Sequence, residues 1–503
     1  MIATDIVNQV SVEEYLDNLK KTLHNVFHEI DNIDLFSQKR GFPALVLRNI
    51  METNPLSVAI PTQYGGRGAK VNECLAVLEA ASYESLPLSL TFGINIGLFL
   101  EPVAKYAQEV VKGDIFKRFL TKQNMGGLMI TEPDFGSDAL NMQTSNIKHG
   151  NTYHIKGTKH WQGLTGMADY WIMTSREKNQ NGKLGRDLDF FISDNQQPEQ
   201  HVIVDEYYNN IGLYAIPYGI NNIDIKVPQQ FKLQPESTGI KLLMDLLHRS
   251  RMQIPGMAMG FIRRMLDESI KHCNTRIVSG KHLLALDQVK LQIAKIQSHY
   301  TVCSAMCVRS SDISGIDNNM ALAGVEANSM KTYVSDAMQE SAQTFTQLSG
   351  ANGYKMENPG SRGIVDSRPF QIFEGANELL YTEISEMVIK IMTRKKTMNL
   401  SNFLEVYELT DKAADYFKSL LDFNVDINLS QRRIVDLGKI ISRVVSTKHV
   451  IDLGIKGFRP DLIADSIEML KHEVTTLVSS YKCHTKVNPI EDYSDGGSWL
   501  AYS

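Results

Sequence analysis

The sequence predicts an α+β protein, mostly α, in which a compact β-domain lies between two helical regions. Up to about residue 125 the apolar residues recur at helical spacing, and Pro and Gly mark the loops. From Leu128 to about Leu233 the pattern changes to short alternating runs, which is typical of a small β-sandwich or β-barrel. After Gly239 helical periodicity returns and continues almost to the end of the chain.

A chain of 503 residues exceeds the size at which one hydrophobic core usually stops growing, so several domains are expected. We expect an N-terminal helical domain at 1–126 and a middle β-barrel or β-sandwich domain at 127–236. A C-terminal four-helix-bundle domain at 237–396 and a helical extension at 397–503 follow. The cleft between the β-domain and the helices is the expected ligand site.

The individual elements follow from the same periodicities. The expected helices of the N-terminal domain are 11–30, 35–52, 70–85, 93–109 and 113–122. The expected strands are 152–156, 170–174, 188–193, 201–205 and 223–227. The expected helices of the bundle and the extension are 239–275, 283–312, 318–349, 377–395, 401–423, 430–455 and 461–481.

Composition excludes several classes of protein. The net charge of −5 argues against a nucleic-acid protein that works by bulk electrostatics. Five scattered cysteines show no zinc-ligand pattern, which predicts core thiols in a reducing cytoplasm and no metal. The acidic N-terminus does not resemble a signal peptide. The most apolar window, Leu88–Leu100, is shorter than the ~20 residues of a membrane helix, so no membrane span is expected.

The segment from Asp366 to Glu378 carries the candidate catalytic residue. Glu374 follows Phe373 and precedes Gly375, which has no side chain to block the approach of a ligand. A buried carboxylate among aromatic neighbours has a raised pKa, as suits a general base. An acid at this place also fits an ordinary helix N-terminus, and from this segment alone that is the favoured interpretation.

Several motifs together resemble one family. The β region opens with Thr131-Glu-Pro-Asp-Phe-Gly-Ser-Asp138, and Trp161 follows on a predicted strand. Further on stand Gln347-Leu-Ser-Gly-Ala-Asn-Gly-Tyr354 and Glu374-Gly375. In order and spacing, these motifs resemble the acyl-CoA dehydrogenase superfamily across roughly residues 10–395. The resemblance implies the three-domain fold of that family and an FAD cofactor.

The resemblance also implies which residues contact the flavin. Thr131, Gly136 and Ser137 would offer hydroxyl and backbone donors, although a plain Ser-Gly turn would look the same. Trp161 would offer a flat face to the flavin, or else pack in the core. The complete set of implied cofactor residues is Leu128, Ile130, Thr131, Gly136, Ser137, Trp161, Gly163, Arg276, Gln288, Gln347, Gly350, Ala376 and Glu378. Of these, Arg276, Gln288, Gln347 and Gly350 would reach the FAD of a neighbouring subunit.

The implied reaction is FAD-dependent α,β-dehydrogenation of an acyl thioester. Glu374 would remove the α-proton, and the backbone N–H of Ala376 would help to polarise the thioester carbonyl. The implied substrate-binding residues are Ser137, Arg251, Phe373 and Gly375. The position before Arg251 is Ser250, so the alternative base position of some family branches holds no carboxylate. His248 is expected to be structural or to lie in the substrate cleft.

Three positions depart from the usual family pattern. Gly163 stands where Thr or Ser is common, Ala376 stands in place of Thr, and Leu128 replaces an aromatic residue. Gly163 resembles the acyl-CoA oxidase branch and is expected to leave room for oxygen beside the flavin. An oxidase, or a desaturase acting on a carrier-protein thioester, is therefore the second hypothesis.

A third hypothesis, from another class, is a non-catalytic flavin-bearing protein of the alkylation-response type. Residues 401–503 hold 12 Lys and Arg against 15 Asp and Glu, which disfavours a nucleic-acid surface. An apolar stripe at 434, 437, 441, 444 and 445 predicts a packing or oligomer role for the extension. The expected partners are acyl-CoA or an acyl-carrier protein, electron-transfer flavoprotein or O2, and further copies of the chain in a homodimer or homotetramer.

Overall fold

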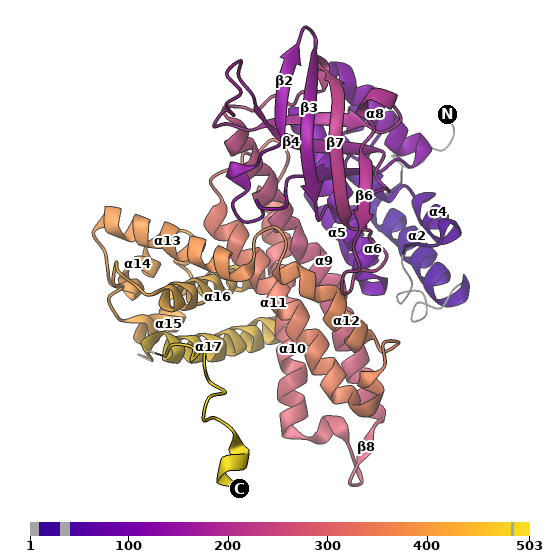
Figure 1. Cartoon of the computed structure of the whole chain (residues 1–503). Helices are drawn as coiled ribbons and strands as arrows, with labels where there is room; N and C mark the ends of the chain where they lie inside the picture. The colour runs from indigo at the N-terminus through magenta and orange to yellow at the C-terminus, as the bar shows by residue number, and fades with distance from the viewer. Residues whose placement is uncertain (1–9, 31–40, 484–486) are drawn as a thin grey trace.

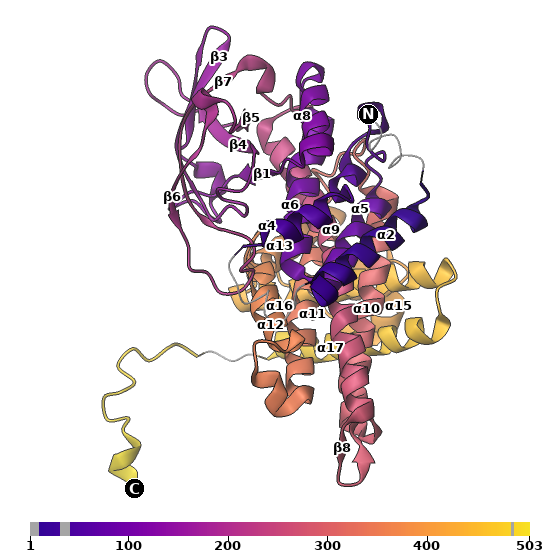
Figure 2. The same cartoon turned by 90° about the vertical axis from the view of Figure 1, so that its right-hand side faces the viewer.

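The structure is a computed structural model that describes residues 10–30, 41–483 and 487–503. A twisted β-domain lies at one end, and long helices run away from it (Figure 1). The N-terminal helices pack beside the bundle, and the helical extension lies on the bundle's other side (Figures 1 and 2). The predicted fold class, with its order of helical, β and helical parts, is confirmed.

The N-terminal domain is helical, as predicted. It comprises α2 (Val12–His24), α4 (Ala44–Met51), α5 (Val71–Glu84), α6 (Leu86–Asn95), α7 (Glu101–Tyr106) and α8 (Glu109–Lys122). Ser11 and Ser85 cap α2 and α6 by accepting hydrogen bonds from Glu14 N and Leu88 N. The helix predicted at 35–52 begins only at Ala44, and positions 35–40 lie outside the described residues.

One helical run is longer than the sequence pattern indicated. The segments α6, η4 (Ile96–Leu100) and α7 form a continuous run from Leu86 to Tyr106. Within the described residues it is the one helix long and apolar enough to cross a membrane by length and composition, and 94% of its apolar window is buried inside the fold. Packing in the core accounts for this hydrophobicity, and the run supplies one wall of the site described below.

The middle domain is one twisted sheet in the order β1-β4-β2-β3-β7-β6, with β5 paired to β4. Its strands are β1 (Gly126–Met129), β2 (Ser145–His149), β3 (Thr152–His160), β4 (Tyr170–Glu177), β5 (Asp189–Asp194), β6 (Ile203–Tyr207) and β7 (Gly219–Pro228). Strands β1 and β2 were not predicted. β1 begins with two glycines because a Cβ on Gly126 would lie 2.3 Å from the Phe99 ring and one on Gly127 would lie 2.5 Å from the Trp171 ring on β4.

The C-terminal bundle consists of α9 (Gly239–Thr275), α10 (Asp287–Ile313), α11 (Gly324–Ser349) and α13 (Asn377–Lys395), close to the predicted ranges. A short hairpin of β8 (Ile277–Val278) and β9 (Lys281–His282) and a helix α12 (Pro359–Ser367) were not predicted. Helix α9 packs on α5 so closely that a Cβ on Gly260 would lie 2.0 Å from Glu79 O. This contact holds the N-terminal domain against the bundle.

The extension consists of α14 (Leu400–Glu405), α15 (Ala414–Leu421), α16 (Gln431–Ile455) and α17 (Pro460–Lys482). The single helix predicted at 401–423 is therefore two helices with a turn between them. The apolar stripe of α16 packs inside the chain: Leu437, Ile441, Val444 and Val445 are fully buried. Helix α16 contacts α13, α10 and α11, so the predicted packing role is confirmed within one chain.

Candidate active site

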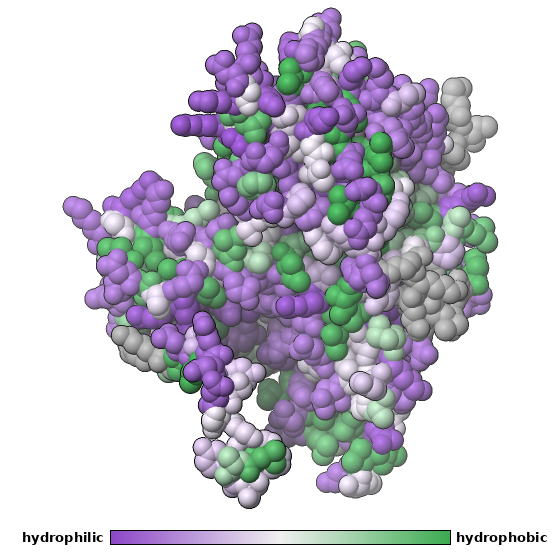
Figure 3. Space-filling model, in the orientation of Figure 1, coloured by the Kyte–Doolittle hydropathy of each residue, from purple (hydrophilic) through white to green (hydrophobic). Residues whose placement is uncertain are grey.

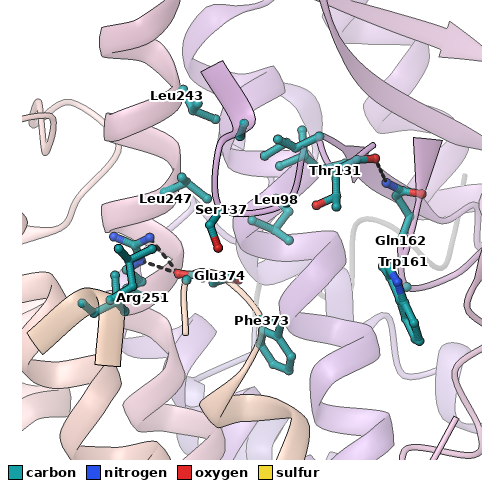
Figure 4. A pocket seen from close by; sticks show the side chains of 18 of the residues that line it. Leu98, Thr131, Ser137, Trp161, Gln162, Leu243, Leu247, Arg251, Phe373 and Glu374 are labelled. Carbon is teal, nitrogen blue, oxygen red and sulfur yellow. Dashed lines mark hydrogen bonds between the residues drawn. The ribbon is translucent and has the colours of Figure 1, made fainter. Parts of the chain in front are cut away.

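A cavity of about 380 Å³ lies where the β-domain meets α6, α9 and the start of α13 (Figure 4). It brings together eleven of the residues predicted for the site. They are Leu128, Ile130, Thr131, Gly136, Ser137, Trp161, Gly163, Arg251, Phe373, Glu374 and Gly375. Residues more than 200 positions apart in the sequence therefore meet at one place, between the domains where the cleft was expected.

Glu374 stands in a tight turn immediately before α13. Its backbone φ is +54°, and that of Gly375 is +95°. A non-glycine residue in the left-handed region is strained and persists only where its surroundings hold it. Its side chain reaches the cavity, and carboxylate atom Oε2 is buried with no hydrogen-bond partner in the protein. A buried, unpaired carboxylate oxygen beside a cavity is free to accept a proton from a ligand there.

Two buried cations hold the backbone of this turn. Arg251 on α9 donates from Nε and Nη2 to Glu374 O, at 3.1 and 2.7 Å, and from Nη1 to Asn328 Oδ1 at 2.6 Å. Lys331 on α11 donates from Nζ to Gly375 O at 2.8 Å. Arg251, predicted as a substrate-binding residue, thus contacts the main chain of the Glu374 turn and also lines the cavity.

The electrostatics of the turn suit a general base. Burial raises the pKa of Glu374, while the Ser250 hydroxyl, 2.8 Å from its Oε1, and the charge of Arg251 act in the opposite direction. Burial also lowers the pKa of Lys331 to about 7, against the opposing effect of the Glu374 charge. The carboxylate therefore holds a proton more readily than an exposed glutamate does, yet it is not isolated from positive charge.

The opposite wall comes from the β-domain. Trp161 has a φ of +62° and is 52% exposed, which is unusual for so large an apolar ring at the end of a strand. Its ring lies beside Tyr208, with 4.3 Å between the ring centroids. Gln162 Nε2 donates to Thr131 O at 3.2 Å and so ties the Trp161 turn to the loop after β1 (Figure 4). The open face of Trp161 and the exposed Ser137 hydroxyl are both available to a ligand.

Gly163 lines the cavity and is closely packed. A Cβ at this position would lie 2.7 Å from Ile94 Cδ1 and 3.3 Å from Ile216 Cγ2. The volume that a side chain would occupy is already filled by these two residues. The close packing therefore explains why glycine stands here, and the expectation that oxygen enters beside the flavin stays a prediction.

The remaining predicted cofactor residues do not line this cavity. Ala376 is the N-cap residue of α13, and Glu378 is exposed in its first turn. Four others are exposed at or near the end of the bundle that carries the β8–β9 hairpin or α12: Arg276, Gln288, Gln347 and Gly350. Figure 1 shows this hairpin at the end of the bundle opposite the β-domain.

The long apolar walls of the cavity were not predicted. They come from one face of α6 and its continuation and from one face of α9: Leu90, Ile94, Leu98, Leu243, Met244 and Leu247. The apolar window Leu88–Leu100 and the predicted helix 93–109 carry part of this signal, but neither indicates which face lines a cavity. His248 is not among the lining residues; its Nδ1 lies 2.8 Å from Met320 O, and burial lowers its pKa to about 4.

No metal site was predicted, but one group of side chains in the described part of the chain has ligand spacing. The ligand atoms of His24, His28 and Glu84 all lie within 4.8 Å of one another. Two of the three residues are exposed, and none lines the Glu374 cavity.

Comparison with known families identifies the class of protein that this fold and cavity define. The N-terminal, middle and C-terminal domain models of acyl-CoA dehydrogenase match residues 13–123, 127–223 and 237–389. The chain belongs to the acyl-CoA dehydrogenase superfamily. It is an FAD-dependent oxidoreductase of the type that acts on CH–CH donors.

Relatives with curated names are distant but cover most of the chain. An acyl-CoA dehydrogenase of Bacillus subtilis is 24% identical over 361 residues, which is 71% of this chain and 92% of the relative. Isovaleryl-CoA dehydrogenase of Pongo abelii is 24% identical over 356 residues, or 70% of this chain and 81% of the relative.

Solved structures share the fold. An acyl-CoA dehydrogenase of Bacillus anthracis complexed with FAD covers 95% of this chain and 93% of its own, with a TM-score of 0.75 and 16% identity. A prolyl acyl carrier protein oxidase covers 75% of this chain and 98% of its own, with a TM-score of 0.67 and 18% identity. The match to the first of these includes much of the extension.

The residues present fit an FAD at this cavity. Trp161 offers a half-exposed aromatic face for stacking, and Thr131 and Ser137 offer hydroxyl groups beside it. Gly136 has open space around its Cβ position, so a phosphate or ring could approach the backbone closely. Glu374 lies across the cavity with a buried oxygen that no protein group satisfies.

Proposed function

We propose that the protein catalyses α,β-dehydrogenation of an acyl thioester, with Glu374 as the base that removes the α-proton. The observation that carries the proposal is the buried, unpartnered Oε2 of Glu374, which lies in the same cavity as Trp161 and Ser137. When bound, FAD supplies the acceptor for the β-hydrogen, which leaves the substrate as hydride. The chain's own residues supply the base, the groups that hold it and the walls of the acyl site.

Glu374 has the position and the environment to take the proton. Arg251 and Lys331 fix the turn through its carbonyl groups, so the carboxylate stays aimed into the cavity. Ala376 caps α13, and N–H groups in the first turn of a helix have no partner within the helix. Gly375 just before this helix lines the cavity, and we propose that a free N–H at the helix start stabilises the negative charge on the thioester oxygen when the α-proton leaves.

The walls of α6 and α9 define the acyl site. Apolar side chains line the region between Glu374 and the β-domain, and they match the alkyl chain of a thioester. We propose an acyl-CoA as the substrate; a carrier-protein thioester is the alternative. The finding that Ile94 and Ile216 fill the space at Gly163 favours a dehydrogenase that passes electrons to a flavoprotein over an oxidase.

A second copy of the chain would complete the cofactor site. We propose that Arg276, Gln288, Gln347 and Gly350 contact the FAD of a partner in a homodimer or homotetramer. Hydrophobic residues gather at the lower end of the bundle in Figure 3, and Ile277 near this end is 58% exposed. Exposed apolar surface of this kind favours contact with another chain. A cytoplasmic location remains part of the proposal.

The test is turnover of the Glu374→Gln variant with a panel of acyl-CoA substrates. Glutamine keeps the shape of the side chain but cannot take the proton, so we expect FAD content to be unchanged and turnover to fall at least about a hundredfold. Glu386→Gln, at an exposed position on α13 away from the cavity, is the matched control and should stay active. Substantial turnover in Glu374→Gln would refute the proposal.

A further inference from the structure

The turn that carries Glu374 is fastened on both sides by one carboxylate. Asp336 on α11 accepts a hydrogen bond at Oδ1 from Gln371 Nε2 at 2.7 Å, before Glu374 in the chain. The same oxygen accepts one from Asn377 Nδ2 at 2.8 Å, after Glu374. Its second oxygen accepts from the hydroxyl of Tyr381 at 2.7 Å. Asp336 therefore holds Gln371 and Asn377, on either side of Glu374, at a fixed spacing.

The helical extension supplies the cation for this carboxylate. Arg443 on α16 donates from Nη1 to the Tyr381 hydroxyl at 2.7 Å, and its Nη2 lies 3.8 Å from Asp336 Oδ2. Its Nε donates to Glu473 on α17 at 3.2 Å. The Arg443 side chain is only 11% exposed, and its guanidinium lies 5.2 Å from the centre of the Tyr333 ring. A buried guanidinium in this many contacts has little freedom to move.

The helix backbones also meet at this point. A Cβ on Gly438 of α16 would lie 2.0 Å from Tyr381 O, so only glycine permits the approach. Ser385 on α13 donates from Oγ to Ile434 O on α16 at 2.6 Å. The extension thus rests directly on the first turns of α13, and Arg443 is aimed at the Tyr381 hydroxyl.

From Tyr381 the contacts continue to the proposed base. Asn377 accepts at Oδ1 from Lys331 Nζ at 2.8 Å, and the same Nζ donates to Gly375 O at 2.8 Å. The chain of contacts therefore ends on the carbonyl group of Gly375, the residue after Glu374. This is the place where the left-handed backbone most needs external support.

We propose that Arg443 of the helical extension is a positioning residue for Glu374, acting through Tyr381 and Asp336 on the turn that holds the base. The inference rests on the proposed role of Glu374 and adds a function for the extension. A second link between the extension and the bundle serves as the comparison. His449 Nε2 lies 3.0 Å from Glu326 Oε1, in a buried pair with no hydrogen bond or ion pair to residues 371–381.

The experiment compares Arg443→Met with His449→Leu in the full-length holoenzyme. Each change removes a buried polar head and keeps most of the side-chain volume. We expect Arg443→Met to keep its FAD and to lower kcat at least about tenfold, with KM little changed. His449→Leu should keep the wild-type kcat. Backbone amides at 372–380 should exchange hydrogen faster in Arg443→Met and not in His449→Leu.

Tyr381→Phe tests the same link with a smaller change and covers the case in which Arg443→Met does not fold. The Phe variant should reproduce the kcat loss, and combining it with Arg443→Met should add little, because both remove one chain of contacts. Equal kcat in Arg443→Met and His449→Leu, with unchanged exchange at 372–380, would overturn the inference. The exchange result does not depend on turnover, so it separates this inference from a failure of Glu374 as the base.

Discussion

Removing the Ser250 hydroxyl should move the pH dependence of catalysis to higher pH. Ser250 Oγ donates to Glu374 Oε1 at 2.8 Å, and Ser250 is only 5% exposed, so water does not readily replace the donor. A hydrogen bond to a charged group contributes about 1.5–3 kcal/mol. Ser250→Ala removes a contribution of this size to the ionised form and should therefore raise the pKa of Glu374 further.

The sign follows from which form of the carboxyl the hydroxyl stabilises. The bond favours the ionised form, and burial already raises the pKa of Glu374, so the variant raises it further. Because the base must be ionised, kcat falls as the pH drops below the pKa of Glu374. In Ser250→Ala this acid-side loss should begin at a higher pH, and kcat should approach the wild-type value at pH values above it.

The assay is kcat measured across pH for wild type and two further variants. Ser250→Thr keeps a hydroxyl and should restore the wild-type profile. Ser269→Ala removes a buried hydroxyl of the same helix that donates to Met265 O, and it should change nothing. An unchanged profile in Ser250→Ala, or an equal shift in Ser269→Ala, would refute the reasoning.

Three further predictions follow from other contacts. Gly163→Ser should reduce FAD content because of its clash with Ile94, and adding Ile94→Ala should restore it; equal FAD in both variants would contradict the packing described. Trp161→Ala should weaken FAD binding about three- to tenfold, measured by fluorescence titration; unchanged affinity would exclude stacking. Burial raises the pKa of Glu326, but hydrogen bonds from His449 and Arg309 outweigh burial and lower the pKa to about 2. The ionised carboxylate therefore stabilises the fold above pH 4.5, and this stabilisation is lost as the pH falls toward 2. Glu326→Gln should therefore cost about 3 kcal/mol at neutral pH, with a difference in Tm that shrinks in that acid window; a constant difference would argue against it.

The sequence predicted the domains in their order and the long helices closely, because both depend on periodicity that local sequence carries. Helices α9 and α13 begin and end where the pattern indicated. Strand β1 has no signature in the sequence because its two glycines are required by the approach of Phe99 and Trp171, which only the packed structure shows. The helix predicted at 401–423 is two helices in the structure, because apolar spacing alone does not reveal the turn between α14 and α15.

The same distinction applies to the candidate site: residues within motifs could be predicted, and their partners from distant helices could not. The motifs name Glu374, Trp161 and Ser137 directly, and all three line one cavity in the structure. The partners of Glu374 come from distant helices and carry no motif of their own. The sequence distinguishes Ser250 only as a position without a carboxylate, and it does not show the hydrogen bond to Glu374. The strained φ of Glu374 has no signature in the sequence. The bonds from the extension to α13 required the packed structure.

The most direct test of the central claim is anaerobic mixing of the FAD-loaded protein with an acyl-CoA, followed by absorbance of the flavin. In the wild type the flavin should bleach in a single turnover, because Glu374 takes the α-proton as the hydride leaves. Glu374→Gln with equal FAD should bleach at least about a hundredfold more slowly. Bleaching of Glu374→Gln at the wild-type rate would contradict the assignment of Glu374 as the base.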